Sequence, residues 1–499
     1  MKTQITSLKI NKRSQMKRII INISLALSAM MFLNSCGRTF EEINTDTSKI
    51  INPTAGSLLS PVQFDMASYG YNRADDFTFQ IMQIAIPFPN EGNTVSRYYL
   101  TEGTGNGYWN TSYKWLKQVK EMHTFAVAEN QKNYQAIAMV LNAFIYANLT
   151  DAFGDIPFSE ALRLEENMTR PKFDSQKDIY ITLLDDLKAA NALFDTTKPL
   201  TETDLFFHGE ASAANMVKWK KFANSLSLRL LNRIKKRNGE VNVYARIQEI
   251  VNDPATYPIF QNNADGVVLD ISGVAPFTPP IARPQDFTAY RAAGELFVNT
   301  LKDNNDPRLA KFFTQAKSLT APNPNIGYFG APAGYAPGTV FTYQPSNMNQ
   351  NLAKAPLKIL VYPYAELQFT LAELAQKGII SGSAQTFYEN GVKATLEQWG
   401  DTVPANYFAN PKVAYNGTLE QIMTQKYIAL FFVDHQQWYE QRRTGYPVMP
   451  NNGGLLNNGQ MPQRMMYPTN PRIMNTQNYN AAVTAMGGDD INVKMWWNK

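Results

Sequence analysis

The sequence predicts a mostly α-helical fold, an α-superhelix of paired antiparallel helices with a loop-rich second lobe and minor β structure. Apolar residues recur at helical spacing over two long stretches, about 106–255 and 356–445. Proline, glycine and asparagine are frequent in the parts that separate them, about 51–105, 256–355 and 446–499. Patterns typical of strands are few and short, and 266–271 is one example.

The first helical stretch carries clear amphipathic periodicity. Between Tyr134 and Asp151 the apolar residues follow the spacing i, i+3, i+4, i+7 and i+8, which places them on one face of a helix. Similar stripes continue to about residue 255. We expect helices over 109–128, 134–151, 178–194, 213–236 and 243–252.

Basic side chains are frequent from Arg229 to Arg237, near the end of the fourth of these helices. An anion-binding site is one interpretation. The other is that cations in the last turns of a helix interact favourably with its dipole. We adopt the second interpretation as the prediction.

Residues 256–355 change in character, with many prolines among glycine, asparagine and aromatic residues. They predict a loop-rich lobe that contains one helix near 287–302. Helical periodicity then returns, with Pro363 in the first turn of a helix over 362–377 and Gly378 at its end. We expect further helices over 383–399 and 419–441, followed by loops over 446–499.

The expected helices over 362–377 and 383–399 are joined by a short turn, which favours an antiparallel pair. Aromatic and small residues at their expected crossings are typical of tetratricopeptide-like pairs, although no strict repeat of about 34 residues is present. The prediction is therefore a superhelix of tetratricopeptide-like helix pairs.

The N-terminus predicts an exported, lipid-anchored protein. Lys17 and Arg18 precede a 15-residue apolar run that ends at Asn34-Ser35-Cys36, a small-residue cleavage site. A membrane-spanning helix would need about 20 apolar residues. Cys36 is the only cysteine and stands where a lipobox places its lipid-accepting residue. We expect a signal peptide over 1–35, a flexible tether over 36–50 and one domain over 51–499, with Met16 as an alternative start.

The formal charge of +5 belongs to the precursor. Six basic residues and no acidic residue precede Cys36, so the remainder has a net charge near −1. The usual argument from a basic balance to a nucleic-acid partner therefore does not apply, and we expect no nucleic acid among the partners.

Few residue patterns point to catalysis or to a cofactor. The three histidines, His123, His208 and His435, are far apart in the sequence and form no metal-binding motif. Paired carboxylates such as Asp151 with Asp155 could serve a glycoside hydrolase, but solvated or capping roles are commoner. We expect no metal, no cofactor and no enzymatic activity, and keep an envelope glycoside hydrolase as the least favoured alternative.

Aromatic residues form 12% of the chain, and many lie in expected loops. Sugar rings stack on aromatic planes, while asparagine and arginine side chains bond to hydroxyl groups. Two segments, 88–99 and 328–343, combine these residue types. The ligand-binding candidates are Phe88, Asn90, Arg97, Tyr98, Tyr99, Tyr328, Phe329, Tyr335 and Tyr343.

Several short stretches together resemble the SusD/RagB family of outer-membrane nutrient-binding lipoproteins, and most of all its SusD-like subgroup. Their order and spacing along the whole chain carry the resemblance more than any single motif does. The stretches are 40–46, 151–161, 219–229, 306–309, 364–373, 425–427, 438–447, 464–468, 478–482 and 494–497.

The resemblance implies a non-enzymatic lipoprotein, anchored in the outer membrane through Cys36 and facing the cell exterior. It implies an oligosaccharide as ligand and a SusC-like TonB-dependent barrel transporter as partner, over which the lipoprotein acts as a lid. Capture of peptides, as in RagB-like members, is the alternative. Few charges in the candidate loops favour sugars over peptides.

Overall fold

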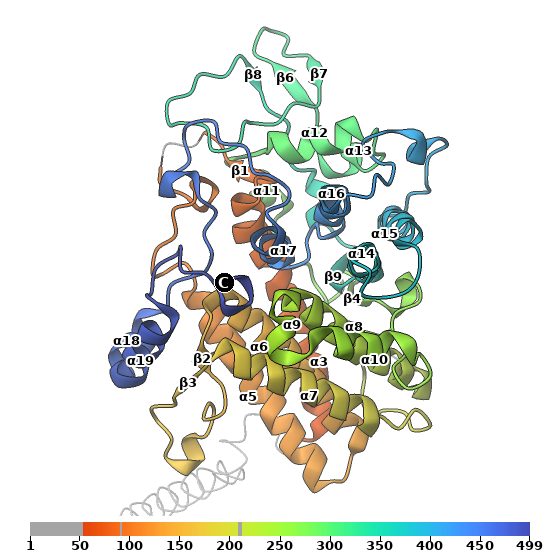
Figure 1. The fold of residues 1–499 in the computed structure, drawn as a ribbon. Coiled ribbons are helices and arrows are strands. Elements are labelled where there is room, and N and C mark those ends of the chain that lie inside the picture. Colours follow the sequence, from red (N-terminus) through yellow and green to blue (C-terminus); the bar gives the residue numbers. More distant parts are fainter. Residues whose placement is uncertain (1–52, 90–91, 208–211) are drawn as a thin grey trace, which may run out of the picture. The chain divides into compact units, whose positions relative to one another are not determined.

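The computed structural model describes residues 53–89, 92–207 and 212–499 (Figure 1). The chain divides into two units, Met1–Pro53 and Thr54–Lys499, and all that follows concerns the second. The predicted signal peptide over 1–35, the lipid site at Cys36 and the tether over 36–50 lie outside the described residues.

The first helical stretch forms an array in which consecutive helices pack side by side. All five predicted helices are confirmed, with their ends moved by a few residues at most. They are α5 (Asn106–Ala128), α6 (Lys132–Phe153), α7 (Gln176–Leu193), α8 (Ala213–Arg233) and α10 (Val243–Asn252), with the short α9 (Asn238–Val241) before α10.

Helix α6 lies between α5 and α7 and also contacts α8. Among the described residues it is the one helix long and apolar enough to span a membrane by length and composition, and 89% of its apolar window is buried inside the protein. Burial on nearly all sides explains why its sequence is apolar all round. Helix α6 is thus a central helix of the scaffold.

The second helical stretch contains α14 (Tyr364–Gln376), α15 (Ala384–Gln398), α16 (Leu419–Ala429) and α17 (Gln436–Thr444). The single helix predicted over 419–441 is wrong, because the chain turns between α16 and α17. Phe432 and Asp434 have φ values of 65° and 41°, which a helix cannot contain. Arg73 donates a 2.8 Å hydrogen bond to Asp434, so a tertiary ion pair holds the turn.

The expectation of loops over 51–105 is corrected by a long helix, α3 (Ala55–Arg73). A reciprocal capping box between Thr54 and Ser57 begins it. It continues through a π-helical turn (Ala74–Thr78) into α4 (Phe79–Ile81). Pro61 and the glycines of α3 obscured the periodicity, and packing against α5 and the strand β9 (Leu357–Tyr362) stabilises the helix instead.

The C-terminal region also contains helices where loops were predicted. The short helix α18 (Thr469–Met474) is followed by α19 (Thr476–Met486), which packs beside the strand β3 (Phe173–Asp174). Asn475 and Asn478 donate hydrogen bonds to the backbone carbonyls of Pro171 and Arg170. Contacts with a segment distant in sequence therefore order this part of the chain.

The β structure is minor, as predicted. The strand expected at 266–271 is β4 (Val267–Ile271), and it pairs antiparallel with β9 (Leu357–Tyr362). The remaining strands are β1 (Ala85–Pro87) with β5 (Arg291–Ala293), β2 (Ile156–Pro157) with β3 (Phe173–Asp174), and β6 (Ala316–Ser318) between β7 (Asn325–Gly327) and β8 (Tyr343–Gln344).

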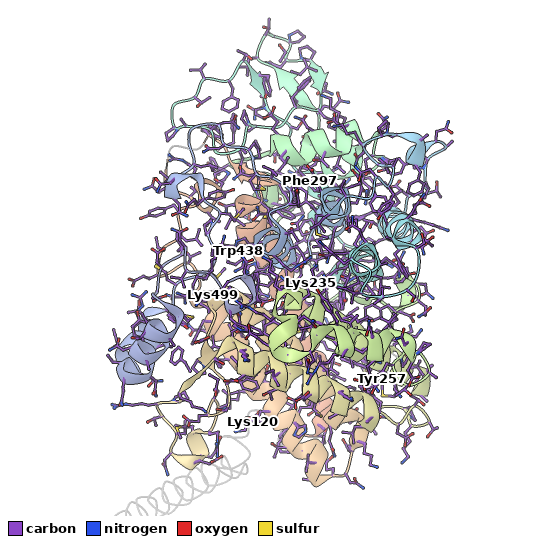
Figure 2. All side chains as sticks on the ribbon, viewed as in Figure 1. Lys120, Lys235, Tyr257, Phe297, Trp438 and Lys499 are labelled. Carbon is purple, nitrogen blue, oxygen red and sulfur yellow. The ribbon has the colours of Figure 1, made fainter. Side chains whose placement is uncertain are left out.

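The helix predicted near 287–302 is only partly correct. That segment contains the end of α11 (Pro284–Thr288), then strand β5, and then α12 (Glu295–Asp303), with α13 (Leu309–Phe312) shortly after it. Side chains fill the interior of the protein, and both Phe297 of α12 and Trp438 of α17 (Gln436–Thr444) are fully buried there (Figure 2).

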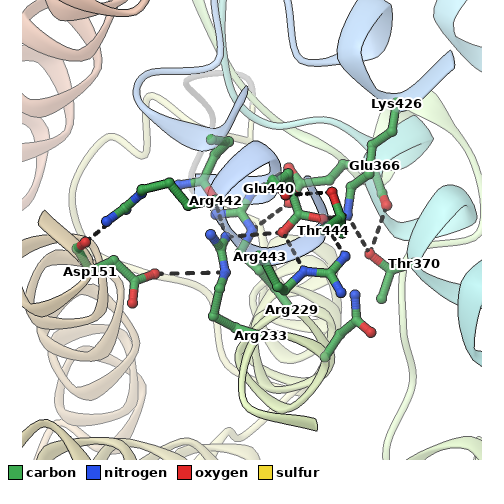
Figure 3. Close-up of polar contacts among 12 residues, drawn as sticks. Asp151, Arg229, Arg233, Glu366, Thr370, Lys426, Glu440, Arg442, Arg443 and Thr444 are labelled. Atoms are coloured by element: carbon green, nitrogen blue, oxygen red, sulfur yellow. Dashed lines mark hydrogen bonds and ion pairs between the residues drawn. The ribbon is translucent and has the colours of Figure 1, made fainter. Parts of the chain in front are cut away.

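A buried network of ion pairs joins the two helical stretches (Figure 3). Arg229 of α8 donates two hydrogen bonds to Glu366 of α14, at 2.7 and 2.5 Å. Arg233 lies 3.5 Å from Glu440 of α17. These arginines hold carboxylates of other helices, so the prediction that the basic run mainly serves the helix dipole is corrected.

Arg443 and Glu373 form the core of this network. The Arg443 guanidinium donates to both oxygens of Glu373, at 2.8 and 2.7 Å, and to Glu440 at 2.7 Å. Lys426 also donates to Glu440, at 2.9 Å. Because unpaired charges are costly to bury, each of these groups depends on its partners in distant parts of the sequence.

Candidate functional site

The structure brings the two predicted aromatic segments together. The Phe88 ring lies 4.9 Å from the Phe341 ring and 6.3 Å from the Tyr335 ring, measured between centroids. Tyr343 lies 6.3 Å from Phe341 and 6.0 Å from Phe329. We call these five residues the aromatic cluster. Four of them were candidates from the sequence, and Phe341 was not.

Short strands position the aromatic cluster. Strands β1 and β5 pair at Ile86 and Ala292, and these two residues are buried together with Ala331 and Tyr335, with Phe88 and Phe341 packed against them. Main-chain hydrogen bonds join Ala331 to Ala293 and to Glu295, at 2.8 Å each. Segment 328–335 is thereby fixed against the edge of the β1–β5 pair.

Hydroxyl hydrogen bonds orient two of the rings. The Tyr335 hydroxyl donates to the carbonyl of Pro87 at 2.9 Å, and the Tyr343 hydroxyl donates to the carbonyl of Gly330 at 2.9 Å. Partial burial, and then the nearby Glu295 carboxylate, raise the pKa of Tyr343 above its ordinary value. The Tyr343 side chain is therefore neutral and its ring plane is held in place.

The aromatic cluster has a buried end and an exposed end. Tyr335 is 4% exposed, whereas Phe329 is 40% exposed. The Lys302 ammonium lies 4.4 Å from the centroid of the Phe329 ring. A ring fixed on one side and open to solvent on the other can stack with the apolar face of a ligand.

Tyr290 was not among the candidates, because the sequence predicts a helix over that position. It stands directly before β5, is 88% exposed, and its carbonyl accepts a 2.9 Å hydrogen bond from the backbone N–H of Phe88. Its φ of 53° lies in the left-handed region, which is costly for a residue with a bulky side chain. A strained backbone that presents an exposed ring is characteristic of binding sites.

Arg97 and Tyr98 are buried instead of exposed to solvent. The Arg97 guanidinium donates to the carbonyls of Gly454 and Gly92, at 2.6 and 3.0 Å. Tyr98 is 1% exposed, and burial raises its pKa far above the ordinary value. Both side chains are therefore buried inside the protein, where they stabilise the backbone around them and do not reach solvent.

The remaining candidates differ in position. Tyr99 is 44% exposed, while Tyr328 is half-buried against the main core. Asn90 lies outside the described residues. Residues 53–89, 92–207 and 212–499 contain no group of three or more His, Cys, Asp and Glu side chains arranged to hold a metal ion.

Comparisons with known proteins identify the family. Residues 46–468 match the SusD-like family described as "Starch-binding associating with outer membrane". No curated protein matches the chain.

Solved structures show the same fold. A SusD homologue from Bacteroides fragilis NCTC 9343 is 25% identical with a TM-score of 0.76, and the alignment covers 90% of this chain and 100% of that one. A chitin-binding protein is 25% identical with a TM-score of 0.73, over 89% of this chain and 100% of that one. A SusD-like protein from Bacteroides thetaiotaomicron VPI-5482 is 22% identical with a TM-score of 0.73, over 89% and 98%. This chain belongs to the SusD-like family of starch-binding proteins that associate with the outer membrane.

Proposed function

We propose that the chain is a non-enzymatic receptor for oligosaccharides at the outer-membrane surface. It is anchored by lipid on Cys36 and delivers its ligand to a SusC-like TonB-dependent transporter, over which it acts as a lid. The observation that carries the sugar-binding part is the aromatic cluster, in which two distant segments present fixed rings and Phe88 bonds through its backbone to the exposed Tyr290. Family membership and the similar chitin-binding protein support the same ligand class.

The exposed rings are suited to stacking on a chain of sugars. Tyr290 and Phe329 offer open ring surface at 88% and 40% exposure, and each aromatic contact contributes about 0.5–1.5 kcal/mol beyond the area it buries. Segment 328–343 contains no charged residue. A neutral oligosaccharide therefore fits this surface better than a charged peptide.

Isothermal titration calorimetry of the full chain in a sugar-free detergent tests the proposal. The ligands are α-glucan oligosaccharides and chitin oligosaccharides, and a mixed peptide digest serves as the competitor. We expect an oligosaccharide to bind without being cleaved. The double variant Tyr290→Ala, Phe329→Ala should weaken that binding by about tenfold or more.

Tyr244→Ala is the matched control, because Tyr244 is an exposed tyrosine on α10 (38%) outside the aromatic cluster. Its affinity should equal that of the unaltered chain. Binding of the peptide digest alone, or release of reducing ends from a bound oligosaccharide, would contradict the proposal.

Co-purification tests the transporter partner. A tagged chain, extracted from the native outer membrane, should bring down a large TonB-dependent barrel in stoichiometric amount. Recovery of the chain as a species free of any barrel protein would count against the lid role.

A further inference from the structure

A second cleft lies on the outer face of the β4–β9 pair. Along these strands Leu269, Ile271 and Ile359 point into the main core, each about 1% exposed. Side chains alternate along a strand, so the neighbouring residues point the other way. At one end of this outer face Val268 and Leu360, which are register partners, are covered by Trp399 together with Leu430 and Val433.

The other end of the outer face is open. Asp270 and Lys358 are opposite each other there, and both are exposed. Between this end, the turn at Asn351 and the end of α15 at Trp399 lies a cleft of about 480 Å³, which we call the Trp399 cleft. Small-molecule sites in proteins have volumes of about 300–1,000 Å³ and mainly apolar walls.

Trp399 forms a fixed aromatic wall of the cleft. Its ring centroid lies 4.8 Å from that of Phe312 and 5.8 Å from that of Phe431, and Lys311 donates a 2.9 Å hydrogen bond to its carbonyl. The side chain nevertheless remains partly exposed. Leu352 and Leu360 add further apolar surface to the walls.

Polar groups with unused hydrogen-bonding capacity line the same cleft. The Gln398 amide makes no hydrogen bond with any described residue, and the Lys358 ammonium makes neither a hydrogen bond nor an ion pair with the described part of the chain. Asn351 accepts a hydrogen bond from Lys354 at 3.2 Å through its oxygen, which leaves its amide nitrogen for a ligand. Amide groups that both donate and accept are the partners that sugar hydroxyls require.

We propose that the Trp399 cleft is a second saccharide site, of a size for one or two sugar rings, in which a ring stacks on Trp399 and its hydroxyl groups bond to Asn351 and Gln398. The cleft is built from β4, β9, the Asn351 turn and the end of α15, and it shares no residue with the aromatic cluster. It therefore binds sugar whether or not the aromatic cluster does.

Fluorine NMR of the full chain labelled with 5-fluorotryptophan, in a sugar-free detergent, tests this site. The seven tryptophans each contribute a resonance, and Trp399→Phe assigns the one that belongs to Trp399. Maltose, cellobiose and N,N′-diacetylchitobiose are the probes. We expect at least one of them to shift the Trp399 resonance in a saturable manner.

Variants separate this site from the first. The double variant Asn351→Ala, Gln398→Ala should weaken the affinity measured at Trp399 about tenfold, as expected for two lost hydrogen bonds, while the other resonances stay in place. Gln385→Ala is the matched control, because Gln385 is exposed at the start of the same helix and bonds to Glu389 at 2.7 Å. It should bind as the unaltered chain does.

Three results would overturn the inference. One is a Trp399 resonance that none of the three disaccharides shifts. Another is a shift with equal affinity in the Asn351→Ala, Gln398→Ala variant. The third is loss of the shift in the Tyr290→Ala, Phe329→Ala variant, which would mean that Trp399 reports binding at the aromatic cluster.

Discussion

The backbone N–H of Phe88 donates a 2.9 Å hydrogen bond to the carbonyl of Tyr290. This bond extends the β1–β5 pair by one residue and places the backbone of Tyr290, whose side chain is 88% exposed, beside Phe88 of the aromatic cluster. The backbone of Tyr290 is left-handed, and its ring is too exposed to gain much stabilisation from packing. A residue that costs stability in this way is a strong candidate for a role in binding.

Tyr290→Gly should therefore separate stability from binding. Glycine adopts a φ of 53° without strain, which offsets its greater loss of chain entropy on folding. We expect the free energy of unfolding in urea to stay within about 1 kcal/mol of the original or to rise. Oligosaccharide affinity should fall about three- to tenfold. Tyr290→Phe keeps the ring and the strain, so its affinity should be retained; a marked loss of stability in Tyr290→Gly would argue against strain at this position.

Glu373→Gln should destabilise the fold strongly. The change keeps the size of the side chain but removes the charge that pairs with Arg443 and Lys235 in the interior. Loss of one partner from a buried ion pair typically costs about 3–5 kcal/mol, which equilibrium denaturation would measure. Glu166→Gln, which alters an exposed pair with Arg163, is the control and should have little effect. Equal behaviour of the two variants would mean that the buried network contributes little.

Asp186→Asn should stabilise the protein at neutral pH. Burial, and then the neighbouring Asp185, raise the pKa of Asp186 to about 6. An acid whose pKa is higher in the folded state binds more protons in that state than in the unfolded state. The free energy of unfolding therefore falls as the pH rises from about 4 to about 6, and it stays at the lower value above pH 6. If Asp186 were completely buried, its raised pKa would lower the free energy of unfolding at neutral pH by about 3 kcal/mol. Because Asp186 is partly exposed, we expect Asp186→Asn to raise the free energy of unfolding by about 1–2 kcal/mol.

Urea denaturation at pH 4 and pH 8 measures this effect. The Asp186→Asn variant and the original should be similar at pH 4, and the variant should be more stable at pH 8. Glu389→Gln on α15 controls for a general loss of negative charge. A gain at pH 4 as large as that at pH 8 would assign the effect to a cause other than titration of Asp186.

Cys36→Ala tests the lipid anchor predicted from the sequence. The variant should leave the membrane fraction for the soluble fraction, because it lacks the thiol that carries the acyl chains. Its oligosaccharide affinity should be unchanged, since the aromatic cluster lies within Thr54–Lys499. Retention in the membrane fraction would refute lipidation at Cys36, and a loss of affinity would show that the anchor has a role beyond attachment.

Most helices of 106–255 could be predicted from the sequence because each buries one face, and the spacing of apolar residues marks that face, as in α10. Helix α6 is buried on nearly all sides, and its long apolar run marks it as a helix of the interior. Helix α3 could not be predicted in this way, because Pro61 and its glycines weaken the local pattern and its stability comes from α5 and β9. The turn between α16 and α17 likewise depends on the Arg73–Asp434 pair, which joins distant parts of the chain.

The sequence by itself determined the composition of the candidate site and the helical class of the fold. Residue types such as Phe88, Phe329 and Tyr343 are local properties, and so is helical periodicity. Only the tertiary structure decided which rings meet, that Tyr98 faces the core and that Tyr290 faces solvent. These outcomes depend on the pairing of β1 with β5 and on contacts between segments far apart in sequence, and no local pattern of residues records them.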